Sequence, residues 1–294
     1  MKTKAFIYVI IAGIAWGTSG IFVNLLAPYG YTSLQMTALR GTVCFLCLSI
    51  YLLLRDRSLF RATPKQFLLY FGIGASLFGT ASAYFTAMQM TSIATAVVLM
   101  YTAPILVMIF SVAFLGEKLT KLKVVSVVCM LIGCCLVSGI IGGLKFHVGG
   151  ILLGLLSGVC YSVYNILTKV AMQKGCPAMT TTVYNAMFMA LIAMCVCRPG
   201  EIVTNAAQKP LLLIPLMIAL GVVTFVLPYF LYTLAMRDLP AGTASALSIV
   251  EPMSATVFSI VLFQEAMSWA SVVGIILILL AVFLLSRGEN EGDE

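Results

Sequence analysis

The stretch TASALSIVEPMSATVFSIVLF (residues 243–263) decides the fold of this chain. Nearly every residue in it is apolar or small, yet Glu251 and Pro252 stand near its centre. A helix of about 20 mainly apolar residues can cross the ~30 Å hydrocarbon core of a bilayer. A carboxylate at that depth is costly and needs a polar surrounding. The meaning of Glu251 therefore depends on whether water or lipid surrounds the segment.

The composition indicates lipid. Of the 294 residues, 62% are hydrophobic and only 9% are charged, whereas a soluble chain is about half apolar and a quarter charged. So few charges could not cover a water-exposed surface of this size. Long continuous apolar runs favour membrane-spanning helices over the short alternating segments of a β-barrel. We predict an all-α membrane protein.

Ten apolar segments are long enough to span a bilayer. They lie near 5–26, 34–54, 67–88, 93–115, 122–141, 148–170, 180–197, 211–236, 242–263 and 269–286. With the N-terminus in the cytoplasm, thirteen Lys and Arg residues fall on the cytoplasmic side and three on the other. Positive residues mark the cytoplasmic side, so both termini are expected there, in an inner or plasma membrane.

The chain contains a duplication. Residues 12–26 align with 157–171 at an offset of 145, and residues 95–120 align with 243–268 at an offset of 148. Each half holds five spans, so the second half must enter the membrane upside down. This predicts a first five-helix repeat over 1–141 and an inverted five-helix repeat over 148–286. Residues 287–294 form an acidic cytoplasmic tail.

Several short motifs follow one another along the chain in a fixed order. They are Trp16-Gly17, Leu39-Arg40, Pro104 with Gly116-Glu117, and Glu251-Pro252 with Glu265. In this order the chain resembles the ten-span EamA-type permeases of the drug/metabolite transporter superfamily. The second repeat departs from the pattern with Tyr161-Ser162 and with Asn185 at the position of Arg40. The resemblance implies secondary transport of small polar metabolites, often amino acid export, or of organic cations.

Two charged residues lie deep in their spans. At about 1.5 Å per residue, Glu251 lies roughly 13 Å along its segment, near the midplane. Pro252 withholds a donor from the carbonyl of Ser248 and disfavours helical geometry at Glu251, so a kink beside a polar cavity is expected. Arg40 lies within about 5 Å of the same depth. The two could form an ion pair or bind a substrate or proton, and Arg40 could instead snorkel outward.

Other polar and small residues have predicted roles. Glu117 and Glu265 precede spans and are expected at helix starts, where the helix dipole favours carboxylates. Pro104 is expected to kink its helix as Pro252 does. Gly13-x-x-x-Gly17 and Gly150-x-x-x-Gly154-x-x-x-Gly158 permit close helix packing. The residues expected near the midplane cavity, besides Glu251 and Arg40, are Trp16, Tyr101, Tyr161, Tyr164, Asn165 and Asn185.

The leading interpretation is a secondary transporter that works by alternating access. It would take a small-molecule substrate such as an amino acid, in a lipid bilayer, with protons as one coupling ion, and as a monomer or homodimer. The sequence has no phosphate-binding G-x-x-x-x-G-K-[ST] motif, and we expect no enzyme activity, cofactor, metal or nucleic acid. Two alternatives stay open: an organic-cation carrier with an aromatic cage, and a membrane-embedded enzyme or lipid-handling scaffold.

Overall fold

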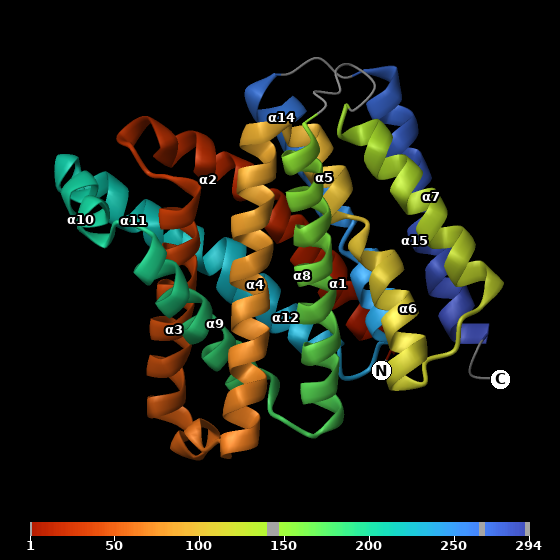
Figure 1. The fold of residues 1–294 in the computed structure, drawn as a ribbon, viewed down its shortest axis with the longest axis horizontal. Coiled ribbons are helices and arrows are strands. Elements are labelled where there is room, and N and C mark those ends of the chain that lie inside the picture. Colours follow the sequence, from red (N-terminus) through yellow and green to blue (C-terminus); the bar gives the residue numbers. More distant parts are fainter. Residues whose placement is uncertain (1, 140–146, 265–267, 292–294) are drawn as a thin grey trace.

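The computed structural model describes residues 2–139, 147–264 and 268–291, and every regular element in these ranges is helical. Figure 1 shows them as one bundle of long helices running up and down. The first half of the chain contributes α1 (Lys2–Gly17), α2 (Ser19–Leu26), η1 (Ala27–Tyr29), α3 (Ser33–Arg55), η2 (Arg57–Phe60), α4 (Pro64–Met90), α5 (Ile93–Met100), α6 (Ala103–Leu115) and α7 (Lys121–Val137).

The second half repeats this order with one additional helix. It contributes α8 (Val148–Gln173), α9 (Ala178–Val196), α10 (Pro199–Gln208), α11 (Pro210–Gly221), the π-helical turn η4 (Val222–Val226), α12 (Leu227–Ala235), α13 (Ala241–Leu247), α14 (Val250–Phe263) and α15 (Trp269–Glu291). In Figure 1, α1 begins at the lower end of the bundle and α8 begins at the upper end, so the two halves run in opposite directions.

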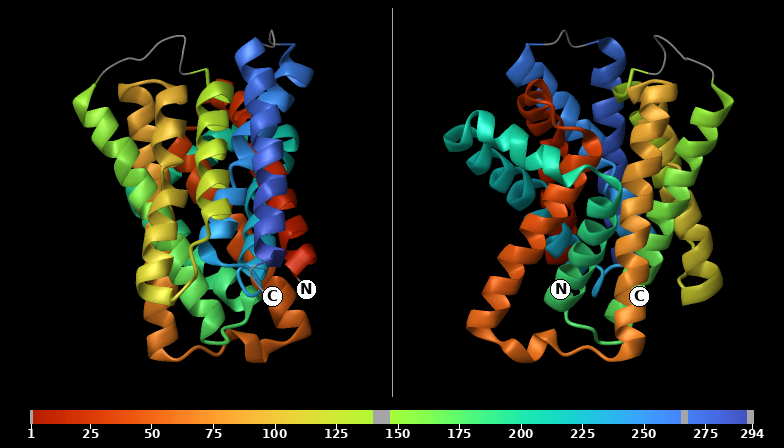
Figure 2. Two further views of the ribbon diagram at one scale, coloured as in Figure 1. Left: turned by 90° about the vertical axis from the view of Figure 1, so that its right-hand side faces the viewer. Right: turned by 60° about the vertical axis from the view of Figure 1, so that its left-hand side comes forward.

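Nine helical stretches in the described ranges are long and apolar enough to cross a membrane. The remaining segment of the ten, expected near 122–141, is α7, which has 17 residues. That length is at the lower limit for a span, which is about 17 residues. It packs along α15 (Figure 2). The ten-span prediction thus agrees with the bundle, with this segment the shortest member.

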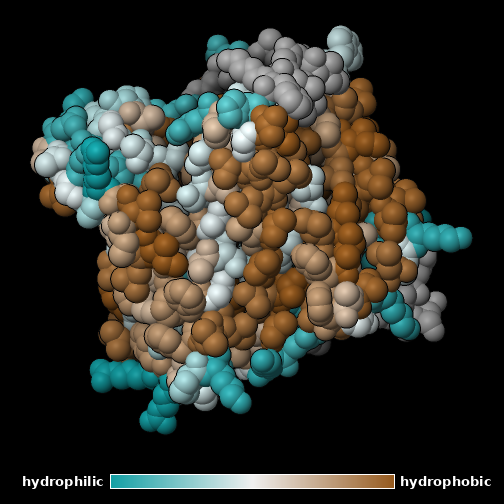
Figure 3. All heavy atoms as spheres, viewed as in Figure 1, coloured by the Kyte–Doolittle hydropathy of each residue, from teal (hydrophilic) through white to brown (hydrophobic). Residues whose placement is uncertain are grey.

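The surface fits a bilayer. Large apolar side chains are exposed on the outside of the bundle, for example Leu68, Phe114 and Leu152, which are 72%, 75% and 62% exposed. Figure 3 shows a broad apolar band with hydrophilic residues gathered toward the ends. A soluble protein rarely exposes apolar patches of this extent, so this band is the surface that faces lipid.

Two spans are broken in the middle. α5 ends at Met100 and α6 begins at Ala103, with Pro104 in the first turn of α6. α13 ends at Leu247 and α14 begins at Val250, with Pro252 in its first turn. Proline lacks the donor that would continue the ladder but fits the first turn of a new helix. The two prolines occupy equivalent positions in the two repeats, so the bundle has a matched pair of discontinuous helices.

Glycines bring whole helices against these breaks. A Cβ atom added at Gly17 of α1 would lie 2.7 Å from the Cβ of Ser254 in α14, and one at Gly13 would lie 3.0 Å from that of Val250. In the other half, a Cβ at Gly158 of α8 would lie 2.9 Å from the Thr102 hydroxyl, beside the first break. Gly154 packs on Leu99 in the same way. The absence of a side chain at these positions lets the backbones approach.

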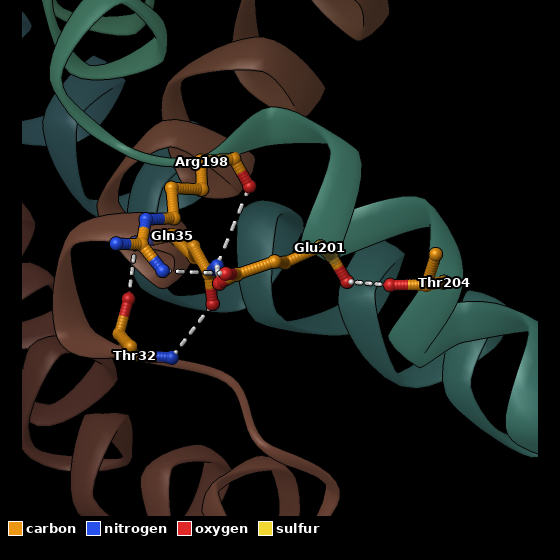
Figure 4. Close-up of polar contacts among 5 residues, drawn as sticks. All are labelled: Thr32, Gln35, Arg198, Glu201 and Thr204. Carbon is orange, nitrogen blue, oxygen red and sulfur yellow. Dashed lines mark hydrogen bonds and ion pairs between the residues drawn. The ribbon is translucent and has the colours of Figure 1, made fainter.

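One helix is absent from the ten-span prediction. α10 lies at the end of the bundle away from α1's start and projects to the side (Figure 2). Gln35, at the start of α3, holds it: its amide donates to Glu201 Oε2 over 3.0 Å and accepts from the Thr32 backbone over 2.9 Å (Figure 4). This capping box closes the α3 N-terminus while anchoring α10.

Candidate functional site

A cavity of about 590 Å³ lies between the two halves. It begins at the helix breaks and extends away from the end of the bundle where α1 starts and η2 lies, which we call the terminal end. Ala94, in the first turn of α5, and Ser138, just after α7, line it near the opposite end. Of the sequence-predicted residues, it is lined by Trp16, Gly17, Arg40, Tyr101, Tyr161, Glu251 and Pro252.

Glu251 and Tyr101 meet at the bottom of this cavity. The Tyr101 hydroxyl donates to Glu251 Oε2 over 2.8 Å and is 3.3 Å from the Ser248 carbonyl oxygen. This is the carbonyl that Pro252 leaves without its usual helical donor. Each residue stands at the break of its own half, so one hydrogen bond joins the two discontinuous helices.

Arg40 lines the cavity from α3. Its hydrogen bond to the Thr37 hydroxyl is long, with 3.4 Å between an Nη atom and the oxygen, and its buried Nε–H has no hydrogen-bond partner among the described residues. Across the described residues no ion pair joins Arg40 to Glu251. The ion-pair alternative is therefore not what the structure shows. The guanidinium instead lines a cavity in which Glu251 is the only other charged lining residue from the described part of the chain.

Aromatic rings form one wall of the cavity. Trp16 packs edge-on against Tyr229 at 5.1 Å between ring centroids and lies 5.3 Å from Tyr232. Phe225 stacks on Tyr229 at 4.1 Å. The indole N–H of Trp16 is buried and has no hydrogen-bond partner within the described ranges, whereas a buried tryptophan usually finds one.

Sequence reasoning missed Tyr229, Phe225 and Tyr84, which all line the cavity. Phe225, Tyr229 and Tyr232 recur at spacings of four and three residues, which places them on one helix face. That spacing was visible beside Pro228, but long aromatic side chains are also ordinary packing residues in an apolar span. Whether these aromatic residues line the cavity depends on which face of their helix packs against Trp16, and the sequence alone does not specify that face.

Three predicted cavity residues lie elsewhere. Tyr164, Asn165 and Asn185 are fully buried and do not line the cavity. Asn165 donates to the Tyr161 carbonyl over 2.7 Å and accepts from the Tyr232 hydroxyl. The prediction placed residues of both repeats around one cavity. In the structure, the first-repeat equivalents of these three residues, Ser19, Gly20 and Arg40, line the cavity, and the three themselves do not.

Glu117 lies at the start of a helix, but this helix is not α7, the next one in the sequence. Its Oε1 accepts from the backbone N–H of Ala241 over 2.7 Å, so it caps α13 in the other half. The following helix, α7, is capped by Thr120 instead. Glu265 lies outside the described residues. Lys169, one of the thirteen Lys and Arg residues assigned to the cytoplasmic side, is only 8% exposed and donates hydrogen bonds to backbone carbonyls.

The fold and site define the chain as a multi-pass helical membrane protein built from two repeats around a central cavity. It belongs to the EamA-like transporter family, whose profile matches residues 3–139 and again 148–287. It is 27% identical over 290 residues to the uncharacterized transporter YwfM of Bacillus subtilis (strain 168), covering 97% of this chain and 94% of that protein.

Other comparisons agree with this assignment. An uncharacterized transporter of Archaeoglobus fulgidus is 28% identical over 279 residues, which is 95% of each chain. A crystal structure of a protein with 21% sequence identity superposes with a TM-score of 0.78 over the full length of both chains, which supports the fold. The family and its relatives indicate a membrane transporter.

Proposed function

We propose that this transporter is a secondary carrier that moves a small amphiphilic metabolite, such as an amino acid, by alternating access. The observation that carries the proposal is the pair of opposite charges in one cavity: Arg40 has no carboxylate partner among the residues the structure describes, and Glu251 lines the same cavity at the helix breaks. A zwitterion presents a carboxylate to the first and an ammonium to the second. The terminal end, with both termini, faces the cytoplasm, as the distribution of Lys and Arg favours.

The size and lining of the cavity support a small solute with an apolar part. About 590 Å³ is within the range of small-molecule sites. Apart from the two charges, the wall is largely aromatic and aliphatic, with Tyr84, Tyr161 and Tyr229 offering hydroxyl groups. Aromatic faces also attract cations, so an organic-cation carrier remains the second candidate. Arg40 in the same cavity disfavours that candidate, because a guanidinium repels a cationic solute.

The test is transport in proteoliposomes with a panel of amino acids and organic cations, with and without a pH gradient. The expected result is uptake of at least one zwitterionic amino acid that Arg40→Gln and Glu251→Gln both reduce at least tenfold. Preserved uptake in both variants, with the same pH dependence as the natural chain, would overturn the assigned site. Uptake of cations alone, unaffected by Arg40→Gln, would select the alternative.

A further inference from the structure

Between the cavity and the terminal end lies a layer of polar side chains that the cavity does not reach. Each is at most 8% exposed. The layer, which we call the polar layer, consists of Tyr164, Asn165, Thr168 and Lys169 of α8, Asn185 of α9, and Tyr232 and Thr233 of α12.

Part of the polar layer is poorly satisfied. Among the described residues, the hydroxyls of Tyr164 and Thr233 lie near each other but make no hydrogen bond of normal geometry, and neither polar atom of the Asn185 amide makes one. Buried polar groups in native proteins are usually hydrogen-bonded, since leaving them unpaired costs free energy. Apolar side chains would pack this region more favourably, so its polarity calls for a functional explanation.

The repeat supplies a second, independent observation. The offset of 148 extends back from residue 95, because Ala87-Met88 meets Ala235-Met236. Every member of the polar layer then has a first-repeat equivalent that lines the open cavity. These pairs are Ser19 with Tyr164, Gly20 with Asn165, Val23 with Thr168, Asn24 with Lys169, Arg40 with Asn185, Tyr84 with Tyr232, and Phe85 with Thr233.

We infer that the polar layer is the closed cytoplasmic half of the solute route. The inference rests on the proposed alternating access: when the opposite end closes, the second repeat opens as the first is open here. Tyr164, Asn185 and Thr233 then line a water-filled cavity at the terminal end, which accounts for their polarity. In the present state they are buried, and the described residues offer their hydroxyl and amide groups no hydrogen bond of normal geometry.

Two charged residues hold this half closed by binding one short segment, 236–242. The Lys169 ammonium donates to the carbonyl oxygens of Met236 and Leu239 over 2.9 and 2.6 Å. The Glu117 carboxylate accepts from the amides of Ala241 and Gly242 over 2.7 and 3.5 Å.

The equivalent contacts at the open end differ. α5 is capped by its own Ser92, whereas α13 follows Pro240, which offers no side-chain cap and leaves that position to Glu117. Asn24 and Met88, the equivalents of Lys169 and Met236, both line the open cavity. The segment 236–242 is thus fastened where its counterpart in the first repeat borders open space.

The test is cysteine labelling by a membrane-impermeant methanethiosulfonate reagent. Thr233→Cys and Asn185→Cys are each made in the full chain, in right-side-out and inside-out membrane vesicles. Peptide mass spectrometry locates the label, so the native cysteines can stay. Because labelling is covalent, it accumulates even when the inward-open state is a minor one. Ala186→Cys is the control, since Ala186 is fully buried on α9 and packs against Gly41 of α3.

We expect both test positions to label in inside-out vesicles and not in right-side-out vesicles, and Ala186→Cys to label in neither. Lys169→Met, which keeps the length of the side chain but cannot donate, should raise the labelling rate of Thr233→Cys about tenfold, since hydrogen bonds from charged groups are among the strongest.

Unlabelled Thr233→Cys and Asn185→Cys in inside-out vesicles, while the same variants still take up an amino acid, would overturn the inference and leave the proposed carrier function standing. The inference is also overturned if Thr233→Cys combined with Lys169→Met labels no faster than the control Ala186→Cys. The reverse result, labelling from the cytoplasmic side with no uptake of any solute in the panel, would support the route and count against the proposed function.

Discussion

Tyr101, at the break between α5 and α6, donates a hydrogen bond of 2.8 Å to Glu251, at the break between α13 and α14. In repeat register Glu251 corresponds to Ala103, so the carboxylate exists in only one half. The centre of the protein is therefore symmetric in backbone and asymmetric in charge. This hydrogen bond links the two discontinuous helices directly.

Tyr101→Phe removes the hydroxyl and keeps the ring. A hydrogen bond to a charged group contributes about 1.5–3 kcal/mol, so we expect the ratio of maximal uptake rate to half-saturating concentration to fall about tenfold or more. The dependence of uptake on pH should also shift, because the environment of Glu251 changes. Concentration series at several pH values measure both. An unchanged profile would show that the contact only packs the breaks together.

Trp16→Phe separates packing from recognition. Phenylalanine keeps the aromatic contact with Tyr229 and Tyr232 but loses the indole N–H. We expect little change in thermal stability and a several-fold weaker apparent affinity for the transported amino acid. Trp16→Ala serves as the comparison, since loss of a buried aromatic ring costs about 3–5 kcal/mol. Equal affinity in Trp16→Phe and the natural chain would assign the residue to packing.

Gly17→Ala should destabilise the bundle. Its new methyl group would lie 2.7 Å from the Ser254 Cβ and 2.9 Å from the Ala255 backbone nitrogen. Overpacking of this kind costs about 1–3 kcal/mol, which a lower melting temperature in detergent would show. The matched control is Gly20→Ala, where nothing lies within 4 Å and alanine favours the helix. Equal melting temperatures for the two variants would refute the close approach of α1 and α14.

Gln35→Glu should loosen α10. The new carboxylate still accepts from the Thr32 backbone, as a capping box allows. It loses the donor to Glu201, however, and places two carboxylates about 3 Å apart, one buried and one partly exposed, where like charges repel. We expect faster proteolysis of the 197–210 segment. Adding Glu201→Gln restores a donor and should reverse the effect. If the single variant digests like the natural chain, Gln35 does not anchor this helix.

The predicted orientation is checked with reporters. A fluorescent protein fused after Glu294 should fluoresce and a phosphatase there should be inactive, since both report the cytoplasmic side. A phosphatase inserted in the 198–210 connection should be active. The opposite pattern would place the terminal end on the non-cytoplasmic side of the membrane and would leave the internal geometry unchanged.

Much of the fold was predictable because bilayer physics leaves clear marks in sequence. Span lengths, the break at Pro252 and the close packing at Gly17 follow from apolar run length, a missing donor and a missing side chain. α10 was not predicted. Its ten residues are too short and too polar for a span, and it depends on Gln35, which is distant in sequence.

The site was predicted in part for a different reason. Repeat alignment treats the two halves as equals, so Trp16 and Tyr164 were both expected at one cavity. In the structure the cavity lies toward one end only, and Tyr164, Asn165 and Asn185 are buried outside it. Under the proposed alternating access, the sequence would serve both conformations, whereas the structure shows one. The partner of Glu117 was missed because it comes from the other half.

The π-helical turn η4 has a consequence for chain length. Such a turn accommodates one residue more than an α-helix would in the same rise. Each residue of an α-helix rotates the chain by about 100°. Without that turn, the extra residue would swing Tyr229 and Tyr232 about a quarter-turn around the helix axis, off the face that meets Trp16. The π-helical turn thus absorbs the extra residue and keeps the aromatic wall facing the cavity.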